Sequence, residues 1–156
     1  MDDTRGEDGV SAKELSCYVG KSVMHYSQAF AAFRAPAAPG QKKRKVFFNL
    51  CAGLFTPVHL FYRKLDAAGV ILVLLELAYY VPTLLSFAGS FSASVVGALQ
   101  FAASGLYFAA KIALCMFGDY IYYRHCVKRI KQIRANYDDG NAPGYYEALN
   151  AKGSPS

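Results

Sequence analysis

The chain has 156 residues, 54% of them hydrophobic, and its 17 lysines and arginines against 11 acidic residues give a net charge of +6. Because much of the apolar content lies in one central stretch, the length leaves no room for a large soluble core. His25, His59 and His125 lie in separate segments, and no catalytic motif is present, so we expect neither an enzyme nor a metal or cofactor site.

The first part of the chain, residues 1–17, begins with acidic residues and is predicted to be a disordered tail. Within it, Ser11 and Glu14 have the spacing of a capping box, in which each side chain satisfies a free backbone N–H at a helix start. We therefore expect a helix to begin near Ser11.

Residues 18–41 are predicted to form a short amphipathic helix on the cytoplasmic side, followed by a proline-rich linker. Val23, Tyr26, Phe30 and Phe33 recur at intervals of three and four, which makes one apolar stripe. The helix is too short and too polar to span a membrane. It is expected to lie on the bilayer surface or to pack on the cytoplasmic end of the membrane segments.

Residues 42–65 are an apolar segment flanked by basic residues. The basic residues before it are Lys42, Lys43, Arg44 and Lys45. Residues 46–61 are apolar but too short for a full span, contain Pro57, and are followed by Arg63 and Lys64. The favoured interpretation is an interfacial or re-entrant segment, because it keeps every basic cluster on one side of the membrane; a third span is the alternative.

The central stretch, residues 66–119, is predicted to be a transmembrane hairpin. Residues 67–87 and 95–117 each have the length of about 20 residues that a helix needs to cross a bilayer. Residues 87–94 between them are rich in serine and contain no lysine or arginine, as expected of a turn outside the cytoplasm. The predicted fold class is all-α, with two spans and amphipathic cytoplasmic helices.

The predicted spans contain two charged residues, Glu76 and Lys111, and one amide side chain, Gln100. Charges at this depth are costly and usually face a partner or water. The spacing predicts one polar stripe through Gln100, Ser104, Tyr107, Lys111 and Cys115, and a second through Glu76, Tyr80 and Thr83. A contact between Glu76 and Lys111 is compatible with this arrangement, either as a structural pair or as part of an ion or proton path.

After the second span, residues 120–137 are predicted to form a basic juxtamembrane helix. Its basic residues are Arg124, Lys128, Arg129, Lys131 and Arg134, and its apolar face carries Tyr123, Val127, Ile130, Ile133 and Tyr137. Such a helix suits an anionic membrane surface or an acidic partner. Residues 138–156 are predicted to be a disordered tail.

The distribution of charge predicts the topology. Lysine and arginine near membrane segments are retained in the cytoplasm, so both termini are expected there. The cysteines Cys17, Cys51, Cys115 and Cys126 have no paired spacing, and none lies in the outside turn, so free thiols are expected.

Several motifs, in order, give the chain a family resemblance. They are Tyr18-Val-Gly-Lys21, Tyr26 with Phe30, Phe48-Asn49, Ala52, Pro57, Phe61-Tyr62-Arg63-Lys64 and Tyr120-Ile-Tyr-Tyr-Arg-His125. In this order they resemble a family of small bacterial inner-membrane proteins, domain-of-unknown-function family 2628, over residues 18–134. The chain departs from that pattern in having no tryptophan and in Thr56, where a glycine usually precedes the proline. The resemblance implies the bacterial cytoplasmic membrane and a similar architecture, and it implies no activity.

The leading prediction for function is a non-enzymatic membrane protein whose basic cytoplasmic face binds anionic lipid or a protein partner. The five basic residues of the juxtamembrane helix would carry the contact, assisted by the earlier basic clusters. The rival prediction is an oligomeric channel or small transporter that uses Glu76 and Lys111. The Lys42–45 block is interpreted as a topology anchor, so no nucleic-acid partner is expected.

Overall fold

A computed structural model describes residues 5–35, 46–50, 57–89, 92–137, 140 and 142–153. Its helices are α1 (Ala12–Val19), a 3₁₀ turn η1 (Gly20–Ser22), α2 (Val23–Arg34), α4 (Val58–Tyr62), α5 (Asp66–Phe87), α6 (Ala93–Ala135) and α7 (Tyr145–Gly153). The predicted all-α class with two apolar helices is confirmed for these residues. The chain divides into two compact units, residues 1–47 with 119–156 and residues 48–118.

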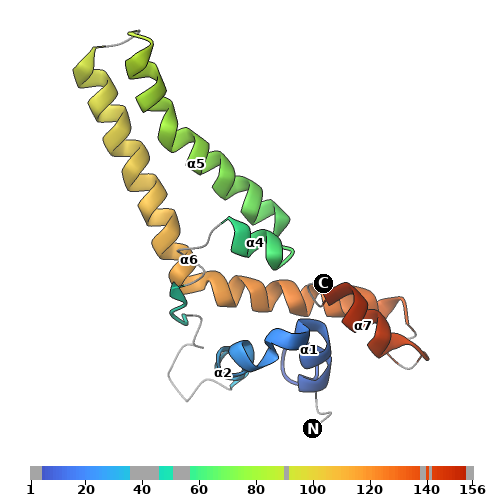
Figure 1. The fold of residues 1–156 in the computed structure, drawn as a ribbon. Coiled ribbons are helices and arrows are strands. Elements are labelled where there is room, and N and C mark those ends of the chain that lie inside the picture. The colour runs from blue at the N-terminus through green and yellow to red at the C-terminus, as the bar shows by residue number, and fades with distance from the viewer. Residues whose placement is uncertain are drawn as a thin grey trace. The chain divides into compact units, whose positions relative to one another are not determined.

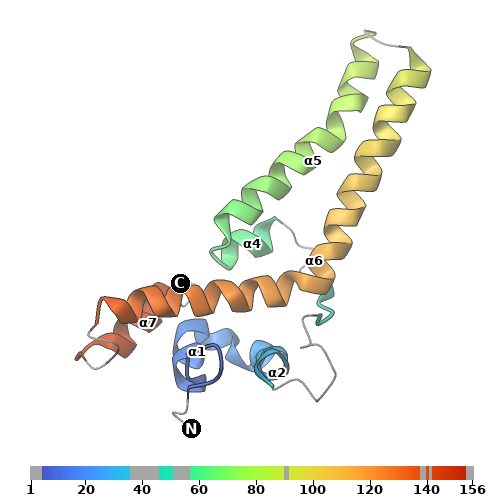
Figure 2. The same ribbon diagram turned by 180° about the vertical axis from the view of Figure 1, so that it is seen from behind.

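The first unit is a small helical domain in which α1, α2 and α7 pack on the C-terminal part of α6 (Figures 1 and 2). The capping box at the start of α1 is confirmed: the Glu14 N–H donates to Ser11 Oγ at 3.2 Å, and the Ser11 N–H donates to Glu14 Oε2 at 2.7 Å. Satisfying two free N–H groups in this way fixes where α1 begins.

An aromatic cluster joins α2 to α6. The predicted stripe on α2 is confirmed, since Tyr26, Phe30 and Phe33 are buried. Phe30 contacts the rings of Tyr122 and Tyr123, with centroids 6.0 and 5.2 Å apart. The apolar face of the basic helix is therefore covered from within the domain, and it does not lie on a membrane surface as its pattern suggested.

Both segments that were predicted to be disordered tails contain ordered elements in the part that the structure describes. Residues 5–17 are ordered: Val10 is fully buried, Arg5 and Ser11 form an isolated β-bridge, and α1 begins at Ala12. At the other end, α7 packs against α1. The physical reason is burial, because Val10, Tyr145 and Leu149 supply apolar side chains to a core that the composition of these segments did not reveal.

The second unit is a helical hairpin with a short helix at its base. α5 ends at Phe87 and α6 begins at Ala93, which places the connection at the predicted serine-rich turn (Figure 1). Both helices are long and apolar enough to cross a membrane, and only 11% and 6% of their most apolar windows are buried. The predicted hairpin is thus confirmed as a pair of helices with outward apolar faces.

Residues 46–61 are described only at their two ends. The Asn49 N–H donates to the Cys115 carbonyl at 2.8 Å, and Pro57 precedes the five-residue helix α4, which packs on the start of α5. The central part, residues 51–56, lies outside the described residues. The interfacial or re-entrant interpretation therefore stays a prediction.

Gly153 gives a test of how tightly α7 packs on α1. A Cβ atom there would lie 2.0 Å from the Tyr18 carbonyl oxygen, which is rigid backbone. We expect Gly153→Ala to push α7 away and to destabilise the first unit by about 1–3 kcal/mol. Hydrogen–deuterium exchange of the full chain in detergent should show faster exchange in α1 and α7. The control is Asn150→Ala, at an exposed position of α7; equal exchange in the two variants would contradict the prediction.

Candidate functional site

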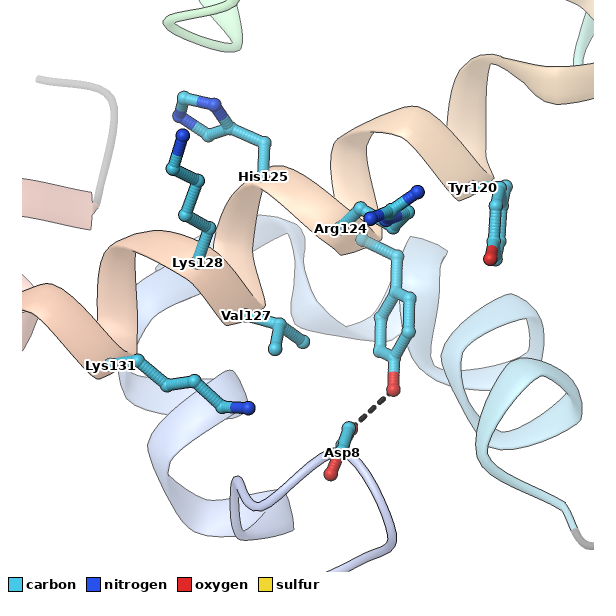
Figure 3. Close-up of a pocket in the computed structure, with 8 residues that line it drawn as sticks. Asp8, Tyr120, Arg124, His125, Val127, Lys128 and Lys131 are labelled. Carbon is cyan, nitrogen blue, oxygen red and sulfur yellow. Dashed lines mark hydrogen bonds between the residues drawn. The ribbon is translucent and has the colours of Figure 1, made fainter.

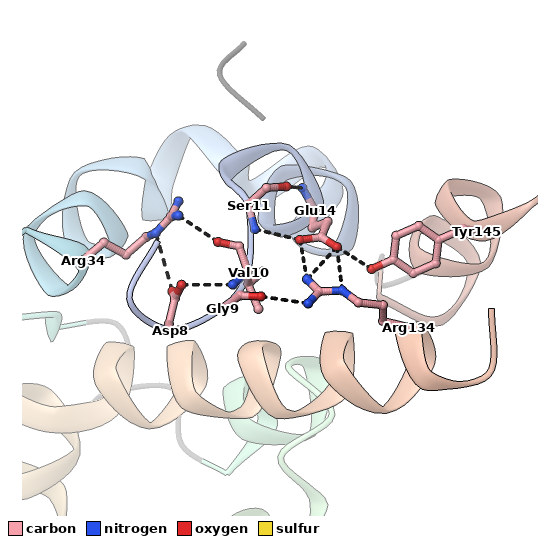
Figure 4. Close-up of polar contacts among 8 residues, drawn as sticks. All are labelled: Asp8, Gly9, Val10, Ser11, Glu14, Arg34, Arg134 and Tyr145. Atoms are coloured by element: carbon pink, nitrogen blue, oxygen red, sulfur yellow. Dashed lines mark hydrogen bonds and ion pairs between the residues drawn. The ribbon is translucent and has the colours of Figure 1, made fainter. Parts of the chain in front are cut away.

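Arg134, predicted to bind lipid or a partner, is instead buried in a polar network (Figure 4). Its Nη2 donates to both carboxylate oxygens of Glu14 at 2.7 and 2.6 Å, and its Nε donates to Oε1 at 3.0 Å. Its Nη1 donates to the Gly9 carbonyl at 2.8 Å. The Tyr145 hydroxyl completes the network by donating to Glu14 Oε1 at 2.6 Å. Arg134 is therefore not available to an external ligand.

The network shifts the protonation equilibria of its members. Burial by itself would raise the pKa of Glu14, but the Ser11 N–H, the Tyr145 hydroxyl and the Arg134 guanidinium outweigh it and lower that pKa. Burial also raises the pKa of Tyr145 to about 12, with a further contribution from its bond to Glu14. Glu14 is therefore held as a carboxylate and Tyr145 as a neutral donor.

A second acidic anchor, Asp8, holds the N-terminal segment to α6 and α2. Its Oδ2 accepts from the Tyr123 hydroxyl and lies 3.5 Å from Arg34 Nε, and its Oδ1 accepts from the Val10 N–H at 3.1 Å. Arg34 also donates to the Val10 carbonyl at 2.8 Å. Burial first, and then the bond to Asp8, raise the pKa of Tyr123.

Beside Asp8 lies a basic concavity, a hollow of about 600 Å³ on the first unit (Figure 3). Its lining residues are Asp8, Tyr120, Tyr123, Arg124, His125, Val127, Lys128 and Lys131. We call it the basic hollow. Seven of these side chains come from α6, where the spacing of Arg124, Lys128 and Lys131 places three cations on one helix face over about 10 Å of rise.

These three cations have no hydrogen-bond or ion-pair partner among the described residues, and all three are exposed. Like charges four residues apart on a helix destabilise it by about 0.2–0.5 kcal/mol. Arg34 and Arg134 of the same unit are in contrast fully engaged with carboxylates. The hollow therefore concentrates positive charge that the fold itself does not use.

The other described residues that were predicted to bind lipid or a partner do not line the basic hollow. Arg129 is exposed on α6 but does not line the hollow, and it donates to Gln132 at 3.4 Å. Arg63 and Lys64 belong to the second unit, where Arg63 is buried against the Tyr62 ring. Lys42, Lys43, Arg44 and Lys45 lie outside the described residues. Of the predicted set, the structure brings together only Arg124, Lys128 and Lys131.

The predicted polar residues of the hairpin form a small cluster between α5 and α6. The Tyr107 hydroxyl donates to Glu76 Oε1 at 2.9 Å, and Thr83 donates to Gln100 at 3.3 Å. Tyr107 also stacks on Tyr79, with centroids 5.1 Å apart. Glu76 and Thr83 of the predicted stripe thus make contacts across the hairpin, whereas at the turn between them Tyr79, and not Tyr80, contacts Tyr107.

Lys111 forms no ion pair with Glu76 in the part of the chain that the structure describes. Its Nζ instead lies 4.8 Å from the centroid of the Tyr107 ring, the same ring whose hydroxyl donates to Glu76. Glu76 is bonded within the hairpin by Tyr107 and not by Lys111, so the predicted Glu76–Lys111 contact, as a structural pair or otherwise, is not found among the described residues. The channel or transporter interpretation stays a prediction.

Other candidate chemistry is limited. Among the described residues, no group of three histidine, cysteine or acidic side chains could hold a metal ion. Cys17, Cys115 and Cys126 form no disulfide among the described residues, and Cys51 lies outside them. No protein-family model, curated protein or solved structure matches the chain, so the resemblance to the bacterial inner-membrane family stays a prediction.

Removing the charge of Glu14 tests the buried network. Glu14→Gln leaves the Arg134 guanidinium buried without a counter-charge, and we expect the first unit to lose about 3–5 kcal/mol of stability. Because the pKa of Glu14 is lowered from 4.5 in the folded state, its contribution is present above that value and is lost as the pH falls through the folded pKa. Melting curves of the full chain in detergent should show this acid-dependent loss in the wild type and not in the variant.

The control for that experiment is Glu147→Gln, at an exposed glutamate of α7. It should melt like the wild type at every pH. A Glu14→Gln protein that retained both the wild-type stability and its acid dependence would contradict a structural role for the pair.

The bond inside the hairpin can be tested separately. Tyr107→Phe removes the donor to Glu76 but keeps the ring that stacks on Tyr79, and we expect it to destabilise the hairpin by about 1 kcal/mol. Unfolding by SDS, followed by circular dichroism, measures the change. Tyr80→Phe is the matched control, because the Tyr80 hydroxyl has no hydrogen-bond partner among the described residues; an equal loss in both variants would argue against the bond.

Proposed function

We propose that this is a small integral membrane protein whose basic hollow binds the phosphate of a membrane phospholipid headgroup. α5 and the apolar part of α6 serve as its anchor. The bacterial cytoplasmic membrane is the location that the family resemblance implies, and the positive-inside rule favours both termini in the cytoplasm. The observation that carries the proposal is the set of three unpartnered cations, Arg124, Lys128 and Lys131, on one concave surface.

The exposed apolar surface of the hairpin supports the membrane location. Leu74, Leu84, Phe101 and Ile112 are each at least 60% exposed, and water is an unfavourable solvent for such a surface. Lipid hydrocarbon can surround this surface without leaving backbone N–H or C=O groups unsatisfied, because both segments are helical. A membrane location therefore accounts for faces that the fold leaves uncovered.

Chain length supports lipid over a protein as the ligand. Only residues 118–123 separate the apolar stretch from Arg124, so the chain keeps Arg124 within about 25 Å of the end of the span. The phosphates of the bilayer lie just beyond the hydrocarbon that the span crosses. Arginine binds phosphate oxygens through two parallel N–H groups, while lysine acts as a point charge, and the hollow offers both.

Binding of detergent-solubilised phosphatidylglycerol to the full chain, compared with phosphatidylcholine, tests the proposal. Each of Arg124→Gln, Lys128→Gln and Lys131→Gln should weaken phosphatidylglycerol binding about fivefold, since one charge near an anionic headgroup contributes about 1 kcal/mol. The matched control is Arg129→Gln, which removes one exposed charge from the same helix without touching the hollow. We expect it to change the affinity less than about twofold.

Two results would overturn the proposal. One is a wild-type protein that does not prefer phosphatidylglycerol to phosphatidylcholine, which would favour an acidic protein as the partner. The other is an Arg129→Gln variant that loses as much affinity as the hollow variants, because the contact would then be a diffuse effect of net charge.

A further inference from the structure

The basic hollow contains one acidic side chain, Asp8, which the binding of a simple anion does not explain. It reaches the hollow from the N-terminal segment and faces the α6 wall that carries the three cations (Figure 3). A carboxylate in an anion site repels the ligand, since charges in a concave, partly desolvated site interact more strongly than in water. Beyond its anchoring of the N-terminal segment through Tyr123 and Arg34, Asp8 therefore either weakens the site or recognises a positive group of the ligand.

The hydrogen bonds of Asp8 favour recognition. Its Oδ2 is engaged by the Tyr123 hydroxyl and by Arg34, which hold the carboxylate in place. Its Oδ1 accepts one bond among the described residues, from the Val10 N–H, and a carboxylate oxygen accepts about two. An acceptor position therefore remains on an anchored, partly exposed carboxylate.

The basic side chain nearest to this segment does not use that position. Lys131 lies over the same turn, with its Nζ 3.5 Å from where a Cβ of Gly9 would be, yet it forms no ion pair with Asp8. Gly9 has a φ of +74°, a conformation that suits glycine and that shapes the turn presenting Asp8. The hollow thus holds its positive and negative groups apart instead of neutralising them.

We propose that Asp8 determines headgroup specificity, so that the hollow takes a phospholipid whose headgroup carries both a phosphate and a primary ammonium group. The phosphate binds to Arg124, Lys128 and Lys131, and the ammonium donates to Asp8. Phosphatidylethanolamine has this chemistry. Phosphatidylglycerol offers the phosphate and uncharged hydroxyl groups but no cation, and the quaternary ammonium of phosphatidylcholine has no N–H to donate. This proposal depends on the proposed function, because it assigns a second contact in the same site.

Asp8→Asn tests the proposal, because it removes the charge while leaving an oxygen that can accept from Tyr123 or Val10. Binding of phosphatidylethanolamine and of phosphatidylglycerol with identical acyl chains is measured on the full chain in neutral detergent. We expect the affinity of Asp8→Asn for phosphatidylethanolamine to fall about tenfold and its affinity for phosphatidylglycerol to rise several-fold. Glu7→Gln, an exposed acidic neighbour outside the hollow, should change neither by more than about twofold.

The affinities of Asp8→Asn for the two lipids are expected to change in opposite directions, and this separates specific recognition by Asp8 from other effects of the substitution. A misfolded variant would lose both affinities. If both affinities rise together, Asp8 is a general repulsive charge and the specificity proposal is overturned, while the loss of phosphatidylglycerol binding in Lys128→Gln would still support the proposed function. If the wild type binds no phospholipid, both proposals fail. Soluble phosphoethanolamine that bound as tightly as the lipid would overturn the assignment to a lipid.

Discussion

The ion pair between Glu14 and Arg134 is the constraint on which the first unit depends. It joins α1 to the end of α6, and through Gly9 and Tyr145 it adds the N-terminal segment and α7. Two charges removed from water are stabilising only when their remaining hydrogen-bonding positions are also filled. The capping N–H of Ser11, the Tyr145 hydroxyl and the Gly9 carbonyl fill several of these positions, so the pair requires all four segments at once.

This constraint separates the basic residues of α6 into two groups with different physical roles. Arg134 faces the domain interior, where its charge is neutralised. Arg124, Lys128 and Lys131 share another face, where nothing in the described chain neutralises them. Lys131 and Arg134 are only three residues apart and lie on adjacent parts of the helix surface, so the contact of Arg134 with Glu14, and not helical phase, gives them different environments. The run is therefore not a single functional unit, although its composition suggests one.

The sequence was sufficient for features that depend on local pattern. Continuous apolar stretches predicted the hairpin, the spacing from Ser11 to Glu14 predicted the start of α1, and the aromatic stripe predicted the buried face of α2. The role of Arg134 and the ordering of both tails depend on contacts between residues more than a hundred positions apart. An acidic tail and a basic helix are each typical of exposed segments. The two segments are buried only because their charges neutralise each other, and this long-range pairing leaves no periodic pattern in the sequence.

Topology and binding make different demands on the same basic residues. The positive-inside rule counts lysines and arginines near a span and is indifferent to where each one lies on the helix. By that rule Arg129 serves as well as Lys128. A ligand site depends instead on the face, because only side chains that converge can contact one headgroup. The convergence of Arg124, Lys128 and Lys131 beside an anchored carboxylate exceeds what topology requires. That excess, and not the net charge of the chain, is the physical basis for assigning the basic hollow a ligand.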